Sequence, residues 1–167
     1  MKKIIFVVFV TLVLIIADQW SKILIQQKFY LGESIPIIKN FFNFTYVQNP
    51  GAAWGMGGQA DTWLRHILFR YLPVIFCFFI IYLIYKSFKE AFHLTLAYTL
   101  ILAGAIGNLI DRFRLDYVVD FLDFYYGNWH FPAFNIADSA ITVGGCLLVY
   151  DVILQSWRER KLKSREC

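Results

Sequence analysis

Residues Met1 to Trp20 read MKKIIFVVFVTLVLIIADQW, and the apolar run inside them continues to about Ile25. A helix needs about 20 apolar residues to cross the ~30 Å hydrocarbon core of a bilayer, and this run has that length. Lys2 and Lys3 ahead of it resemble the start of a secretory signal, but no small-residue cleavage site of the A-x-A kind follows. We therefore expect residues 4–25 to be retained as a membrane-anchoring helix.

The composition indicates that the whole chain belongs in a membrane. The 167 residues are 59% hydrophobic and 19% aromatic but only 17% charged, a balance that argues against a soluble globule. Three further apolar runs of spanning length occupy residues 67–85, 91–110 and 134–154. Because a segment in lipid must satisfy its own backbone polar groups, each run predicts a helix. We expect an all-α integral membrane protein with four transmembrane helices, forming a single domain over residues 1–167.

Lysine and arginine indicate the orientation in the membrane. The start of the chain, the short connection between the second and third spans, and the basic tail at residues 155–167 together hold nine Lys and Arg residues. An even number of spans places all nine on one side, which the positive-inside rule makes the cytoplasmic side. We therefore expect both termini in the cytoplasm and residues 26–66 and 111–133 outside. The net charge of +4 then reflects topology, and no nucleic-acid partner is expected.

The two external segments predict a small β-like lip at the membrane surface. In FNFTYV, residues 42–47, aromatic side chains alternate with Asn and Thr, which is a strand pattern. The glycine-rich NPGAAWGMGG that follows breaks this pattern. Asp61 is positioned to cap a short helix, TWLRHILF, that either lies at the interface or leads into the second span. Trp54, Trp63 and Trp129 are candidate interfacial anchors.

Polar residues in the predicted spans gather at one depth, just beneath the outer surface. With the N-terminus inside, the first and third helices run outward and the fourth runs inward. Asp18 and Lys22 are four residues apart, so they share a helix face and can pair. The converging set is Asp18, Lys22, Asn108, Asp111, Arg112, Asn135 and Asp138, joined by Asn49 and Asp120 from the external segments. Ionisable residues in hydrocarbon are costly and rare, so their convergence predicts a site.

Carboxylate chemistry suits this set better than other chemistries. The three histidines are scattered and no Cys/His cluster or H-E-x-x-H motif is present, so no metal site is expected. Neither Ser21 nor Ser139 has an obvious base to activate it. Two Asp residues that share a site cannot both ionise comfortably, so one keeps a proton while the other activates water. Spacing leaves open whether Asp138 pairs with Asp111 or with Asp120.

Two other classes of membrane protein also place polar residues in their spans. A transporter or proton-conducting protein needs a polar path to the cytoplasmic face, but residues 4–16 and 72–85 are almost entirely apolar. A structural assembly factor would use the polar cluster only to cap and join helices. Outside the cluster, we expect Asp116 and Asp123 to be solvated, and Asp151 to snorkel or to pair with the basic tail.

Five stretches, in order, resemble the pattern of bacterial lipoprotein signal peptidases, also called signal peptidase II. They are DQWSK (18–22), NPGAAW (49–54), AGAIGNLIDR (103–112), VVDF (118–121) and FNIAD (134–138). The resemblance covers nearly the whole chain, with Ala103 a small departure where the family often has a second glycine. It implies an aspartic endopeptidase, needing no cofactor or metal, that removes signal peptides from prolipoproteins. Cleavage is implied on the N-terminal side of the diacylglyceryl-modified Cys.

The same resemblance implies residue roles and partners. The catalytic pair is Asp120 and Asp138. The implied supporting or substrate-binding residues are Asp18, Lys22, Asn49, Gly51, Gly104, Asn108, Asp111, Arg112, Asn135 and Ala137. The implied location is the bacterial cytoplasmic (inner) membrane, with the active site near the outer surface, in contact with membrane lipids and blocked by the cyclic peptide globomycin. The glycine-rich segment after Asn49 is expected to close over the substrate.

Overall fold

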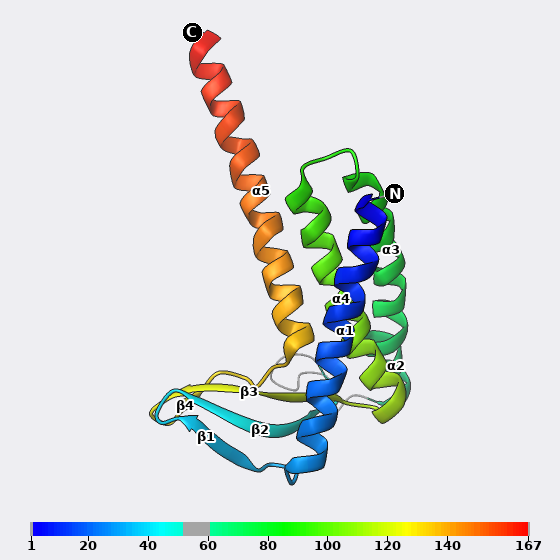
Figure 1. Cartoon of the computed structure of the whole chain (residues 1–167), viewed down its shortest axis with the longest axis vertical. Helices are drawn as coiled ribbons and strands as arrows, with labels where there is room; N and C mark the ends of the chain where they lie inside the picture. The colour runs from blue at the N-terminus through cyan, green and yellow to red at the C-terminus, as the bar shows by residue number, and fades with distance from the viewer. Residues whose placement is uncertain (1, 52–60, 167) are drawn as a thin grey trace.

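The computed structural model describes residues 2–51 and 61–166, which form a helical bundle with a sheet across one end (Figure 1). The elements are α1 (Lys2–Lys28), β1 (Ser34–Ile38), β2 (Phe42–Asn49), α2 (Thr62–His66), η2 (Ile67–Tyr71), α3 (Leu72–Ser87), α4 (Phe92–Leu115), β3 (Val118–Tyr126), β4 (Trp129–His130) and α5 (Ile136–Glu166). Both chain termini lie at the end opposite the sheet. Four helical stretches are long and apolar enough to cross a membrane: Lys2–Lys28, Thr62–Ser87, Phe92–Leu115 and Ile136–Arg158. The predicted class, four spanning helices with a small β lip, is confirmed.

The helices extend beyond the apolar runs that predict them. α4 continues to Leu115, so Asp111 and Arg112 belong to the helix and not to the following external segment. α5 continues to Glu166, so the basic tail is helical. Apolar length marks only the part of a helix that lies in hydrocarbon, and a helix can continue into polar surroundings. Trp54 and the rest of the glycine-rich segment at 52–60 lie outside the described residues.

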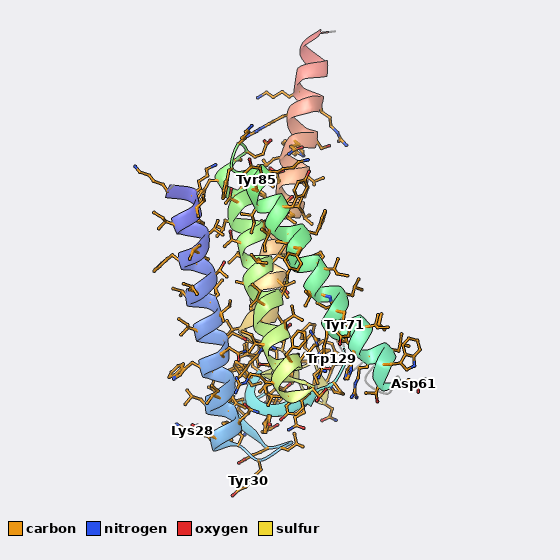
Figure 2. All side chains as sticks on the ribbon, turned by 90° about the vertical axis from the view of Figure 1, so that its right-hand side faces the viewer. Lys28, Tyr30, Asp61, Tyr71, Tyr85 and Trp129 are labelled. Atoms are coloured by element: carbon orange, nitrogen blue, oxygen red, sulfur yellow. The ribbon has the colours of Figure 1, made fainter. Side chains whose placement is uncertain are left out.

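The second span is one continuous helix made of α2, η2 and α3. Asp61 and Tyr85 mark its two ends in Figure 2. The short external helix therefore leads into the span, and Asp61 precedes it without making a side-chain capping bond. Pro73 at the start of α3 has no N–H to donate, and its ring crowds the carbonyl four residues earlier. The π-helical turn η2, directly before α3, is a wider turn of the kind that accommodates such a disruption.

The lip is an antiparallel sheet with strand order β1-β2-β3-β4. The predicted FNFTYV strand is part of β2, which pairs with β3 through Phe42–Phe124 and Asn43–Asp123. Val119 and Phe121 of β3 are buried against Ile25, near the C-terminal end of α1. This apolar contact fixes the sheet beneath the bundle, at the same end as Lys28 and Tyr30 (Figures 1 and 2).

α4 and α5 approach each other closely because glycine lies at their contact. A Cβ atom on Gly104 would collide with the carbonyl oxygen of Ala137, and one on Gly144 would lie 2.7 Å from the carbonyl oxygen of Ala97. Real Cβ atoms do not approach backbone atoms so closely, so larger residues would push the helices apart. The close approach brings the C-terminal half of α4 against the first turn of α5.

Two acidic residues differ from their predicted surroundings. Asp123 is buried, not solvated, and accepts hydrogen bonds from Asn43 and His130. Asp151 is also buried; it lies 2.6 Å from His93 of α4 and accepts a hydrogen bond of 2.6 Å from Gln155. Asn43 and His93 are distant in sequence from these aspartates, and no local pattern indicates them as partners. Asp116 is exposed, as predicted, although it pairs with Arg70.

Candidate active site

A cavity of about 520 Å³ is lined by residues of β3 and of the start of α5. Figure 1 shows that α5 begins directly above β3. Asp120 of β3 and Asp138 of α5 both line it. Other polar residues on its wall are Asn49, Gly51, Asn108 and Arg112, and its apolar wall includes the segment Phe131–Phe134. The cavity therefore joins residues from β2, α4, β3 and α5, as the sequence predicts.

Asp138 is held by the start of its own helix. Asn135 immediately precedes α5, and its Oδ1 accepts a hydrogen bond of 2.9 Å from the backbone N–H of Asp138. The Oδ2 atom of Asp138 accepts in return from the backbone N–H of Asn135, at 3.2 Å. This reciprocal arrangement is a capping box, built here from Asn and Asp. It leaves Asp138 Oδ1 turned toward Asn108, whose Nδ2 donates to it at 2.7 Å.

Asp120 lies in a drier setting, with only 2% of its surface exposed. Its two carboxylate oxygens accept hydrogen bonds from Asn135 Nδ2 at 2.7 Å and from Asn49 Nδ2 at 3.0 Å. Burial, followed by the negative charge of Asp138, raises the pKa of Asp120 from its ordinary 3.8 to about 7. The amide hydrogen bonds and Lys22 oppose this rise without cancelling it. Asp120 can therefore keep a proton at a pH where most carboxyl groups are ionised.

Backbone hydrogen bonds fix the position of β3, which carries Asp120, relative to the start of α5, which carries Asp138. The N–H groups of Phe121 and Leu122 donate to the Phe134 carbonyl at 3.0 and 2.8 Å, and the Phe134 N–H donates to the Leu122 carbonyl at 3.1 Å. β3 is therefore joined to the residue just before the capping box. The spacing of Asp120 and Asp138 is fixed by main-chain contacts as well as by side chains.

Lys22 is the buried charge beneath this pair. It is 1% exposed, and its Nζ lies 2.8 Å from Asp18 Oδ2 and 3.0 Å from Asp111 Oδ2. The predicted Asp18–Lys22 pair is thus present. The Lys22 ammonium also donates to Asn108 Oδ1 at 3.0 Å, which turns the Asn108 amide N–H₂ toward Asp138. A buried ammonium is tolerated where several partners satisfy it, as they do here.

The two carboxylates that hold Lys22 also bind the backbone around the site. Asp18 Oδ1 accepts from the Ala137 N–H at 2.9 Å, and Asp111 Oδ2 accepts from the Val119 N–H at 3.1 Å. Asp111 is therefore engaged with Lys22 and β3, whereas Asp120 shares the cavity with Asp138. Between the two partners that spacing left open for Asp138, the geometry favours Asp120.

Arg112 approaches the cavity from α4 without pairing directly with Asp111. Its Nη2 donates to the Gly51 carbonyl at 3.0 Å, and its guanidinium lies 5.5 Å from the centre of the Phe69 ring. Of the other predicted positions, Gly104 and Ala137 lie at the α4–α5 contact and do not line the cavity. They act on the site only through the distance between the two helices.

Gln19 is a site residue that the sequence prediction did not include. Its Nε2 donates to Asp111 Oδ1 at 2.9 Å and to the Gly107 carbonyl at 3.1 Å. A second polar residue beside Asp18, inside an apolar helix, was the available signal. Among residues 2–51 and 61–166, no group of three His, Cys, Asp or Glu side chains is arranged to hold a metal ion.

Known proteins are similar to this chain in both sequence and fold. The family model described as Signal peptidase (SPase) II matches residues 10–154. The lipoprotein signal peptidase of Syntrophus aciditrophicus is 43% identical over 155 residues, covering 92% of this chain and 96% of that protein. That of Desulforapulum autotrophicum is 44% identical over 144 residues, covering 86% and 89%.

A solved structure described as a bacterial membrane enzyme superposes with a TM-score of 0.79 at 30% identity, covering 90% of this chain and 89% of the other. A second solved bacterial membrane enzyme gives a TM-score of 0.73, also at 30% identity, covering 88% and 92%. With its four membrane-spanning helices, the chain is a multi-pass membrane protein. It belongs to the signal peptidase II family, the proteases that remove signal peptides from prolipoproteins.

Proposed function

We propose that this protein is an aspartic endopeptidase in which Asp120 and Asp138 form the catalytic pair. The observation that carries the proposal is that both carboxyl groups line one cavity, while burial and its neighbour raise the pKa of Asp120 to about 7. One protonated and one ionised carboxyl group are what acid–base hydrolysis of a peptide bond needs. The supporting amides of Asn49, Asn108 and Asn135 hold the carboxyl groups in place.

In the resting enzyme Asp120 carries the shared proton and Asp138 is ionised. Asp138 takes a proton from a water molecule, whose oxygen attacks the scissile carbonyl carbon, while Asp120 gives its proton to the carbonyl oxygen. The resulting tetrahedral diol collapses when Asp138 passes its new proton to the leaving amine and Asp120 recovers its own. No proton is gained or lost over the cycle, and no metal is needed to activate the water.

The substrate is proposed to be a prolipoprotein signal peptide, cut on the N-terminal side of its diacylglyceryl-modified Cys. Such a substrate enters from the bilayer, so the scissile bond must reach the end of the spanning helices, where Asp138 begins α5. The positive-inside rule places the basic end of α5 in the cytoplasm and the sheet outside the inner membrane. The cavity would then lie near the outer surface, where membrane lipids meet its apolar wall and where globomycin would bind.

The test is cleavage of a lipid-modified precursor by the purified enzyme in detergent. Asp120→Asn and Asp138→Asn should each lower turnover by 10²–10⁴-fold or more, since acid–base groups typically contribute about that much. Asp61→Asn is the matched control, because Asp61 is exposed and makes no capping bond. Normal turnover by either variant of the pair would overturn the assignment.

A pH–rate profile provides a second readout of the same pair. The active form carries one proton, so the rate should fall when the pair gains a second proton and when it loses its last. Because the pKa of Asp120 is raised to about 7, the alkaline limb should lie well above the range of an isolated carboxyl group. Sensitivity to a metal chelator, or a profile governed by one group in the Lys range, would contradict the mechanism.

A further inference from the structure

A second polar cluster lies on the sheet, centred on the buried carboxylate of Asp123. The Oδ2 atom of Asp123 accepts from Asn43 Nδ2 at 2.9 Å, and His130 Nδ1 lies 2.9 and 3.0 Å from its two oxygens. The His130 ring stacks on Tyr125, with ring centroids 4.9 Å apart and an angle of 8° between planes. Asp123 has 6% of its surface exposed, so its charge is held almost entirely by protein groups.

This cluster is separate from the catalytic pair. Side chains alternate between the two faces of a strand, so Asp120 and Asp123, three residues apart on β3, point to opposite faces. Asp123 does not line the cavity. Any effect of Asp123 on the cavity must therefore act through its contact with His130 and the residues that follow His130.

His130 is followed directly by the segment Phe131–Phe134, which forms the apolar wall of the cavity. The far end of this wall is secured where Phe134 pairs with Leu122. Its near end is held by β4, which is only two residues long, and by a hydrogen bond of 2.8 Å from the Phe131 N–H to the Phe124 carbonyl. The Phe131 ring also contacts Trp129 and Phe134, with centroids 6.5 and 6.0 Å away. So short a ladder is weak alone, and the Asp123–His130 contact adds a charge-assisted bond at that end.

We infer that the Asp123–His130 pair is a positioning device that fixes the Phe131–Phe134 wall and so sets how well the cavity binds substrate. The inference rests on the proposed function, since it takes the cavity as the substrate site. Asn135 and Asp138 follow the Phe134 anchor and are held by their own capping box, so the chemistry is insulated from movement at His130. Loss of the pair should therefore raise KM and leave kcat nearly unchanged.

Two substitutions separate the Nδ1 hydrogen bond from the ring. His130→Phe keeps a ring to stack on Tyr125 but removes the donor, and should raise KM about tenfold with kcat within about twofold, the pattern of lost binding that is equal in ground and transition states. His130→Asn supplies an amide N–H₂ close to the position of Nδ1 and should recover most of the loss in KM. Tyr126→Phe is the control on the same hairpin, because Tyr126 is 82% exposed and should leave KM unchanged.

The measurements are initial rates across substrate concentration in detergent, with thermal unfolding of each variant. If His130→Phe does not fold, Asp123→Asn replaces it, since it keeps one oxygen that can accept from His130 or Asn43 but not a full charge. Wild-type KM in the folded variant, or a fall in kcat at constant KM, would overturn the inference. Asp120→Asn assayed alongside distinguishes the two proposals: its full activity would refute the aspartic mechanism, whereas an inactive Asp120→Asn beside an unaltered His130→Phe would refute only the positioning role.

Discussion

Asp120→Asn should make the protein more stable while abolishing its activity. The carboxyl group of Asp120 is 2% exposed, and its pKa is raised from 3.8 to about 7. A raised pKa means that the folded protein resists an ionisation that the unfolded chain accepts freely. Folding is therefore penalised at neutral pH, and an amide, which never ionises, escapes that penalty.

The size of the effect follows from the two pKa values. A tenfold change in proton affinity is worth about 1.4 kcal/mol, so the interval from 3.8 to about 7 corresponds to roughly 4 kcal/mol. The amide has a single oxygen, so one of the two bonds from Asn49 Nδ2 and Asn135 Nδ2 is lost. Asn135 Nδ2 keeps Asn108 Oδ1 and the Val119 carbonyl as acceptors, so the larger cost arises if Asn49 loses its bond. One unsatisfied buried donor costs about 1–3 kcal/mol, which leaves a net gain of about 2 kcal/mol.

The difference in stability between Asp120→Asn and the wild type depends on pH. Below pH 3.8 both folded and unfolded chains hold the proton, so the penalty is absent and the variant gains nothing. Between pH 3.8 and about 7 the unfolded chain ionises while the folded protein keeps its proton, so the wild type loses stability as pH rises. Above about pH 7 the stability that Asp120→Asn gains over the wild type is constant and at its largest.

The assay is thermal unfolding in detergent from pH 4 to pH 8, for the wild type, Asp120→Asn and the exposed control Asp61→Asn. The Tm difference between Asp120→Asn and the wild type should be zero or negative near pH 4 and positive above pH 7. Asp61→Asn should track the wild type throughout. A variant that is less stable than the wild type at pH 8, or a difference that does not change with pH, would refute the reasoning.

Three further predictions concern the groups around the pair. Lys22→Met should cost about 3–5 kcal/mol because it leaves Asp18 and Asp111 buried without their counter-charge, and adding Asp111→Asn should restore part of the Tm, which a double-mutant cycle measures. Gly107→Ala would place a Cβ atom 2.8 Å from Asp18 Oδ2 and should lower the Tm, whereas Gly145→Ala, with nothing within 4 Å, should raise it slightly. Arg112→Lys should lower turnover, because an ammonium cannot both donate to the Gly51 carbonyl and stack on the Phe69 ring as the guanidinium does. Wild-type turnover by this variant would show that a positive charge alone is enough.

The membrane-spanning helices and one strand could be predicted from the sequence, because each depends on the length or alternation of apolar residues. The length of the apolar runs located the four spans, and the alternation in FNFTYV located most of strand β2. The expected convergence of Asp120 and Asp138 on one cavity agrees with the structure. The spans and the strand depend on local patterns, so they can be read without knowing how the chain folds back on itself. The choice of Asp120 over Asp111 as the partner of Asp138 came from the family resemblance, since spacing left it open.

What could not be predicted depends on contacts that form only when separate elements of the chain are brought together. Asp123 looks like an ordinary loop carboxylate until Asn43 and His130 are placed beside it. His93 and Asp151 are 58 residues apart, and only the packing of α4 on α5 brings them together. The expectation that Asp123 is solvated would also have made it a control for mutations of the pair, and its burial removes it from that role.

In the proposed mechanism, Asp138 combines a structural role with a catalytic role in one side chain. Its Oδ2 atom caps α5 through Asn135, while Oδ1 faces Asn108 at the cavity. The cap fixes the rotamer of Asp138, so the proposed base would lose little freedom on binding substrate. In the proposed mechanism Asp120 is the acid, because burial is the main cause that raises its pKa to about 7. Asp138 is then the proposed base, and its place at the start of α5 lets Oδ2 serve the cap while Oδ1 is turned toward Asn108.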